Sequence, residues 1–214
     1  MQLEMPEIDT KAVDEGTAGY VRRAYKAVVR EHPVGILPQN ERSIGTVPVE
    51  IDRPDAPYAG VTEFKPDYNG RARARRVGIN ARARGRHAQR ITEHELRHVR
   101  SEGLLNYMDV SEHQARLIME SYAEFAGISN GKEREIVHTT PYAGHVKFAY
   151  AVEGFYKSEF DDATGYKAFI RDIQLYESAR GALKQLGRSI RESGVSMKEV
   201  LRTAENRFAR AKAA

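Results

Sequence analysis

Two histidines four residues apart, with a glutamate next to the first, stand in the stretch RITEHELRHVRSEGLL, residues 90–105. On a helix, residues four apart project from one face, one turn above each other, so His94 and His98 would present two imidazoles side by side. Glu95 lies about 100° further round, where its carboxylate can reach a water next to a metal without binding the metal. The spacing therefore predicts a zinc site in which Glu95 takes a proton from the attacking water.

A helix over residues 89–103 must carry these three side chains. The apolar positions in and just before it form a separate stripe for the core: Ala88, Thr92, Leu96 and Val99. Because the stripe and the histidines lie on different faces, we expect the histidines to face a cleft. The plain alternative is a solvated helix face, on which the three polar residues bind nothing.

A second helix is predicted after Ser111, which is placed to form a capping box with Gln114. Away from its apolar stripe it carries three candidate ligands on one face: His113, Glu120 and Glu124. One of them can complete a set of three protein ligands and leave the fourth coordination place to water. His113 is expected at the surface, and the residues alone leave the choice between Glu120 and Glu124 open.

Short segments rich in β-branched residues lie between an N-terminal helix and the motif helix. They predict three or four strands of a small sheet: VGILP, SIGTVPVEI, GVTEF and RRVGINARA. The N-terminal helix is expected to begin at Thr17 and to end before Pro33. Pro48 predicts an edge position or a bulge for the second strand. The last strand is expected along the edge of the cleft, where an extended peptide could bind by strand addition.

The helical period continues beyond Asn130 to the end of the sequence. Three further helices are predicted, over about residues 144–160, 164–187 and 196–211. We therefore expect an α+β fold with a small mixed sheet. The chain is expected to divide into a first domain over residues 1–130 and a helical extension over residues 131–214.

The combination of HELRH, a short connection and a helix containing ESYAEFA resembles the zincin metallopeptidases, and within them the gluzincin branch. The nearest likeness is to the small intracellular members called minigluzincins, and it covers about residues 15–130. The Gly and His that metzincins carry soon after the second histidine are absent from HVRSEGLL, which excludes that branch. The resemblance implies a zincin-like catalytic domain whose cofactor is Zn²⁺ and whose substrate is a peptide or protein.

Residue roles follow from the resemblance position by position. It implies that His94 and His98 bind zinc and that Glu95 is the general base. It implies further that Glu120, on the glutamate helix, is the third ligand. Glu124 stands where the family often has an acid or amide that steadies a ligand histidine through a hydrogen bond.

A side chain that stabilises the oxyanion of the transition state is expected downstream of the second helix. The segment HTTPYAGHVKFAY offers four candidates: His138, Tyr142, His145 and Tyr150. We favour His145 as the second catalytic residue, because the glycine before it lets a loop approach the cleft. Together these features predict a zinc-dependent endopeptidase.

A basic stretch precedes the motif, since residues 71–90 hold eight arginines and no acidic residue. On strands, its period-two pattern puts four of them on a positive face: Arg73, Arg75, Arg82 and Arg84. Such a face could hold nucleic-acid phosphates or acidic substrate segments, or it could be a solvated edge that resists aggregation. The alternative function is therefore a non-catalytic module that binds nucleic acid or protein, and a peptidase recruited to nucleoprotein combines both.

The composition, with 41% hydrophobic and 30% charged residues among 214, is typical of a globular protein. No apolar run approaches the roughly 18 residues of a membrane span, and the first residues lack the apolar run of a secretory signal. The sequence has no cysteine, which leaves His, Asp and Glu as metal ligands and favours a cytoplasmic location.

Overall fold

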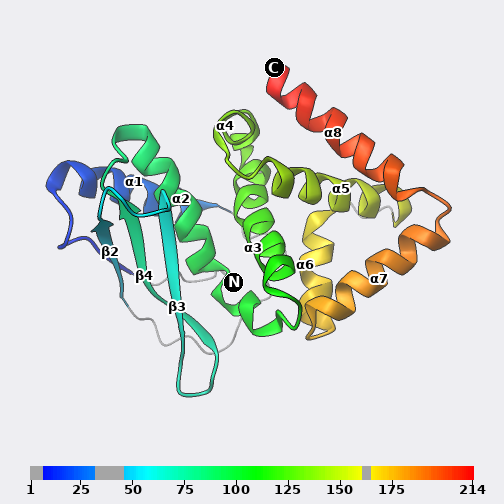
Figure 1. The fold of residues 1–214 in the computed structure, drawn as a ribbon, viewed down its shortest axis with the longest axis horizontal. Coiled ribbons are helices and arrows are strands. Elements are labelled where there is room, and N and C mark those ends of the chain that lie inside the picture. The colour runs from blue at the N-terminus through cyan, green and yellow to red at the C-terminus, as the bar shows by residue number, and fades with distance from the viewer. Residues whose placement is uncertain (1–6, 32–45, 161–164) are drawn as a thin grey trace. The chain divides into compact units, whose positions relative to one another are not determined.

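The structure is a computed structural model that describes residues 7–31, 46–160 and 165–214 (Figure 1). These residues form an α+β fold with a mixed four-stranded sheet and eight α-helices. The chain divides into two compact units, and within the described residues the first comprises 7–31 and 46–106 and the second 107–160 and 165–214. The boundary predicted after Asn130 falls within the second unit.

The sheet of the first unit has the strand order β1-β2-β4-β3. Its strands are β1 (Ile8–Asp9), β2 (Val47–Asp52), β3 (Gly60–Pro66) and β4 (Ala72–Asn80). β2 pairs in parallel with β1 and β4, while β3 pairs antiparallel with β4 and forms one edge of the sheet. The predicted strand VGILP and the first residues of SIGTVPVEI lie outside the described residues.

The prediction that the last strand binds an extended peptide by strand addition is wrong. β4 lies between β2 and β3: its residues 77–79 pair with both strands, and the N–H groups of Ala72 and Ala74 donate to the side chains of Asn106 and Glu102. The edge strands of the described sheet are β1 and β3. Pro48 also does not mark an edge, since β2 is an inner strand. Its missing N–H is tolerated because the pairing with β4 begins only at Val49.

Two helices, α1 (Glu15–Arg30) and α2 (Gly85–Arg100), pack with the sheet around one core. The core is formed by the apolar stripes of both helices and the inward positions of β2 and β4: Val21, Ala24, Val28, Val47, Val49, Val77, Ile79, Ala88, Ile91, Leu96 and Val99. The N-cap of α1 is Asp14, whose carboxylate accepts a hydrogen bond of 3.0 Å from the N–H of Thr17. Thr17 is therefore the partner of the cap rather than the predicted cap itself.

The described part of the second unit is helical. After the 3₁₀-helix η1 (Glu102–Tyr107) come α3 (Glu112–Gly127), α4 (Glu133–Thr139), α5 (Ala143–Glu159), α6 (Tyr166–Leu175), α7 (Ala179–Glu192) and α8 (Met197–Ala213). A short π-helical segment, Ile128–Lys132, joins α3 to α4. α5 packs against α3, α6 and α8 and has a buried side chain in every turn, so it is the centre of this unit.

The stretch predicted as one helix over residues 164–187 contains two helices. The chain turns between α6 and α7, where Glu177 adopts a φ of 48°. Ser178 then caps α7, its hydroxyl accepting a hydrogen bond of 2.9 Å from the N–H of Gly181. Among the described helices, none combines the length and the apolar character needed to cross a bilayer.

Candidate metal centre

The helix that carries the motif, α2, is buried along its last ten residues, 91–100. The predicted core stripe is confirmed, with Leu96 and Val99 fully buried. His94, Glu95 and His98 are only 7%, 6% and 8% exposed. The alternative interpretation, a solvated helix face, is therefore wrong, and the three polar side chains need partners to offset their removal from water.

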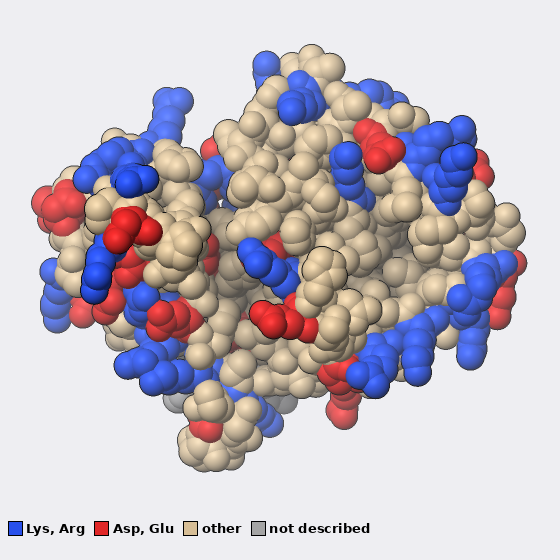
Figure 2. All heavy atoms as spheres, in the orientation of Figure 1, with Lys and Arg blue, Asp and Glu red and all other residues tan. Residues whose placement is uncertain are grey.

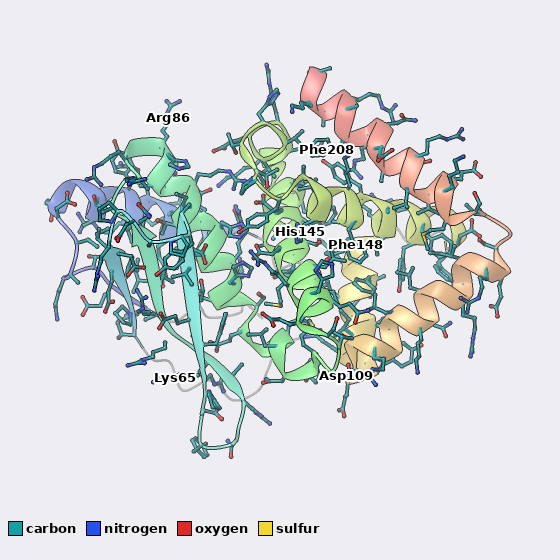
Figure 3. The ribbon with its side chains drawn as sticks, viewed as in Figure 1. Lys65, Arg86, Asp109, His145, Phe148 and Phe208 are labelled. Carbon is teal, nitrogen blue, oxygen red and sulfur yellow. The ribbon has the colours of Figure 1, made fainter. Side chains whose placement is uncertain are left out.

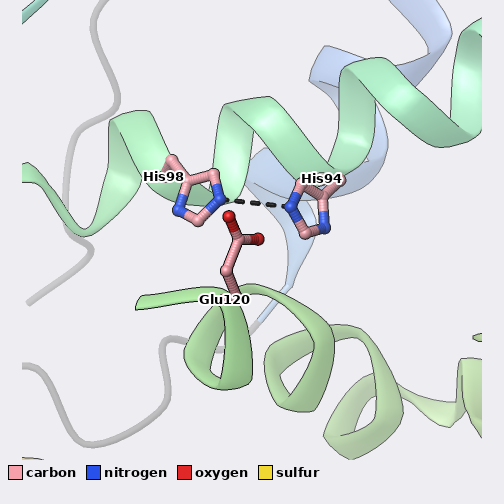
Figure 4. A group of neighbouring side chains, drawn as sticks. All are labelled: His94, His98 and Glu120. Atoms are coloured by element: carbon pink, nitrogen blue, oxygen red, sulfur yellow. Dashed lines mark hydrogen bonds between the residues drawn. The ribbon is translucent and has the colours of Figure 1, made fainter. Parts of the chain in front are cut away.

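The two imidazoles of the motif point toward each other, with His94 Nε2 and His98 Nε2 3.1 Å apart (Figure 4). Two nitrogens that each bind a zinc ion at about 2.05 Å and subtend a tetrahedral angle are about 3.3 Å apart. Glu120 of α3 completes the group, because one ligand atom from each of the three residues lies within 4.8 Å of the other two. This donor set, two imidazoles and a carboxylate, could hold a metal ion.

Glu120 and Glu124 lie one turn apart on α3 in different environments. The Glu120 side chain is 14% exposed and forms a long ion pair, 3.9 Å, with Arg116. Glu124 is almost fully buried and accepts a hydrogen bond of 3.0 Å from Thr140 Oγ1. Glu120 belongs to the group of candidate ligands and Glu124 does not.

His145 lies in the first turn of α5, beside α3 (Figure 3). Its carbonyl oxygen accepts a hydrogen bond of 2.9 Å from the hydroxyl of Ser121, which fixes the start of α5 on α3. Burial lowers the pKa of the half-buried imidazole, against the opposing effect of the Glu120 charge. The residue predicted to stabilise the oxyanion is therefore placed near the candidate ligand Glu120 and is biased toward its neutral form.

The other residues considered from the sequence have different surroundings. His113 is exposed, as predicted, and His138 is exposed as well. The Tyr150 hydroxyl donates a hydrogen bond of 2.5 Å to Glu133, and its ring carries the guanidinium of Arg207 at 3.9 Å. Tyr150 thus holds α8 against α5, while the Tyr142 ring packs edge-on against His145 with centroids 5.3 Å apart.

The arginine-rich stretch does not form one open positive face. Arg73 pairs with Asp67 and Glu102, at 3.2 and 3.0 Å. The other three arginines assigned to the face are exposed: Arg75, Arg82 and Arg84. Over the first unit, on the face drawn in Figure 2, basic and acidic side chains are interspersed.

Arg76, in the same stretch, lies among carboxylates of the sheet. Its guanidinium is 2.9 Å from Asp52, 2.7 Å from Glu63 and 3.5 Å from Glu50. A side chain at the neighbouring Gly78 would collide with Asp52, since a Cβ there would lie 1.9 Å from its Oδ2. This arginine therefore stabilises the outer face of the sheet.

Thr62 of β3 is a site residue that the sequence did not indicate. Its hydroxyl lies 2.8 Å from Oε2 of Glu95, 33 positions along the chain. A lone threonine in a strand carries no local signal of such a contact, so only the fold could reveal it.

Comparison of this chain with protein-family models, with curated proteins and with solved structures gives no match.

Proposed function

We propose that this protein is a zinc-dependent peptidase that hydrolyses peptide bonds in extended segments of proteins. The observation that carries the proposal is the group of His94, His98 and Glu120, which offers three ligand atoms to one ion. The neighbouring Glu95 is buried and lies on the same helix as the two histidines. The likeness of HELRH and ESYAEFA to gluzincins supports the same reaction.

A zinc ion held by the three residues would lower the pKa of a bound water to about 7 and polarise the substrate carbonyl. Glu95 would take a proton from the water as its oxygen bonds to the carbonyl carbon. It would then deliver the proton to the amide nitrogen as the C–N bond breaks. The imidazole of His145 would donate an N–H to the oxygen that becomes negative.

The sheet provides the place for a substrate in this proposal. β3 is one of the two edge strands of the described sheet, and the carboxylate of Glu95 contacts its side-chain face at Thr62. An extended peptide paired with β3 would run beside α2, with its backbone held by main-chain hydrogen bonds. Unfolded proteins should therefore be better substrates than folded ones.

The test is hydrolysis of fluorescently labelled, unfolded casein by the full chain loaded with zinc. We expect Glu95→Gln to lower the rate at least about 100-fold, the usual effect of losing a general base. Glu135→Gln, which changes an exposed glutamate of α4, is the matched control and should leave the rate unchanged. Equal rates for the wild type and Glu95→Gln would show that the proposed reaction is wrong.

The competing proposal is binding of nucleic acid through the exposed arginines Arg75, Arg82 and Arg84. It predicts salt-sensitive binding of DNA or RNA that persists in His94→Ala and in the presence of a chelator. The pairing of Arg73 with two carboxylates leaves this surface with fewer available charges than the sequence suggests. The peptidase is therefore the function that the geometry supports best.

A further inference from the structure

The side chain of Glu95, on α2, is contacted by a residue of strand β3. Thr62 Oγ1 lies 2.8 Å from Glu95 Oε2 and 3.0 Å from the backbone oxygen of Glu95. A hydroxyl has one proton to donate, and both acceptors belong to the same residue. The carboxylate oxygen is the nearer of the two and is charged, so it is the stronger acceptor for the Thr62 proton.

A second residue of β3 shapes the space around the same carboxylate. A Cβ at Gly60 would lie 2.8 Å from Glu95 Oε1 and 2.4 Å from Cγ2 of Ile91. Residues two apart on a strand share a face, so Gly60 and Thr62 both face α2. Glycine leaves room for the glutamate on one side, and the threonine hydroxyl holds it on the other.

From this arrangement we infer that Thr62 is a positioning residue for Glu95, an inference that rests on the proposed peptidase function. A glutamate side chain has three torsions, and one directed hydrogen bond restricts its carboxylate to one orientation. The bond to Oε2 thereby fixes where the carboxylate lies. A general base must lie within hydrogen-bond reach of its proton, and a displacement of about 1 Å can lower a rate about 100-fold.

The backbone of the same two residues faces the outer edge of the sheet. Asn80 N–H of β4 donates a hydrogen bond of 2.9 Å to the oxygen of Ala59, the residue before β3. Bonded pairs alternate along an antiparallel ladder, so the N–H and C=O groups of Gly60 and Thr62 point away from β4. A peptide added to this edge would bond to the residues that position Glu95, so substrate pairing and the position of the base are coupled.

The experiment compares Thr62→Val, which keeps the shape and removes the hydroxyl, with Thr62→Ser, which keeps the hydroxyl. With zinc-loaded protein and unfolded casein, we expect Thr62→Val to lower kcat about 10- to 100-fold, with zinc affinity unchanged. Thr62→Ser should recover most of the lost rate. A kcat for Thr62→Val equal to that of the wild type, or no recovery in Thr62→Ser, would overturn the inference.

Crystal structures of the zinc-loaded variants give a measurement that does not depend on turnover. We expect one orientation of the Glu95 carboxylate in the wild type and in Thr62→Ser, and a displaced or multiple orientation in Thr62→Val. An unchanged Glu95 in Thr62→Val would overturn the positioning role. If the proposed function is wrong, the wild type and Glu95→Gln will hydrolyse casein at the same rate. The crystal structures would still show whether Thr62 positions the Glu95 carboxylate.

Discussion

The guanidinium of Arg97 holds the carboxylate of Glu31 through two hydrogen bonds, 3.0 Å from Nε and 2.8 Å from Nη2. Both side chains are buried, and the pair joins the end of α1 to the helix that carries the two histidines. Glu93 lies 3.7 Å from the same guanidinium. One turn further along α2, Arg100 donates a hydrogen bond of 2.6 Å to the backbone oxygen of Val28. These bonds fix how α2 lies against α1.

Removing one partner of this pair should destabilise the fold. We expect Arg97→Met to lower the free energy of unfolding by about 3–5 kcal/mol, because it leaves buried carboxylates without their cation. Urea unfolding followed by circular dichroism measures the change. The double variant Glu31→Leu with Arg97→Met should regain much of the loss. A double variant less stable than Arg97→Met would contradict this account of the pair.

The third ligand can be tested by separating Glu120 from Glu124. Glu120→Gln should weaken zinc binding by more than about 100-fold, because the loss of a ligand exceeds the loss of a residue that only supports one. Glu124→Gln should bind zinc more tightly than Glu120→Gln, since Glu124 bonds to Thr140. Calorimetric titration of the metal-free proteins gives both affinities. The reverse order would assign the ligand to Glu124.

Zinc should also stabilise the folded chain. At a free zinc concentration 100 times the dissociation constant, binding adds about 2.7 kcal/mol, or roughly 5–10 °C in melting temperature for a chain of this size. Addition of a chelator should reverse the shift. His98→Ala should show no shift, whereas His113→Ala, which changes an exposed histidine, should behave like the wild type. An equal shift in His98→Ala would place the ion elsewhere.

Asp109, in the turn before α3, gives a prediction about pH (Figure 3). Its carboxylate accepts hydrogen bonds from the N–H of Arg180 and the hydroxyl of Ser178, at 2.9 and 2.7 Å, which hold the pKa of Asp109 below its ordinary value. Because the folded state lowers this pKa, the ionised carboxylate stabilises the chain above about pH 4, and its contribution is lost as the pH falls further. Asp109→Asn should therefore unfold more easily at neutral pH and lose less stability in acid, as thermal melts from pH 3 to 7 would show. Parallel melting curves for the two proteins across that range would refute the assignment.

The sequence predicted those parts of the site that depend on local spacing. His94 and His98 are one turn apart on one helix, so their proximity follows from helix geometry alone. The capping box of Ser111 and Gln114 is confirmed for the same reason, since both partners lie within one turn.

Contacts between distant segments could not be predicted in this way. The pairing of Thr62 with Glu95 and that of Arg73 with Glu102 depend on how the sheet packs against α2 and η1. The position of β4 inside the sheet required the strand order, which β-branched patterns do not encode. The turn at Glu177 interrupts an apolar period that continues on both sides of it, so one helix was predicted where two exist.

The cluster around Arg76 has a consequence for engineering the basic stretch. Its guanidinium is the cation shared by Asp52, Glu63 and Glu50. In Arg76→Met these three carboxylates would repel one another across the strands, and protonation would relieve the repulsion. The Arg76→Met protein would therefore be more stable in mild acid than at neutral pH. If arginines of this stretch are replaced to test for nucleic-acid binding, a loss of binding after replacement of Arg76 could come from a destabilised sheet instead of a lost phosphate contact.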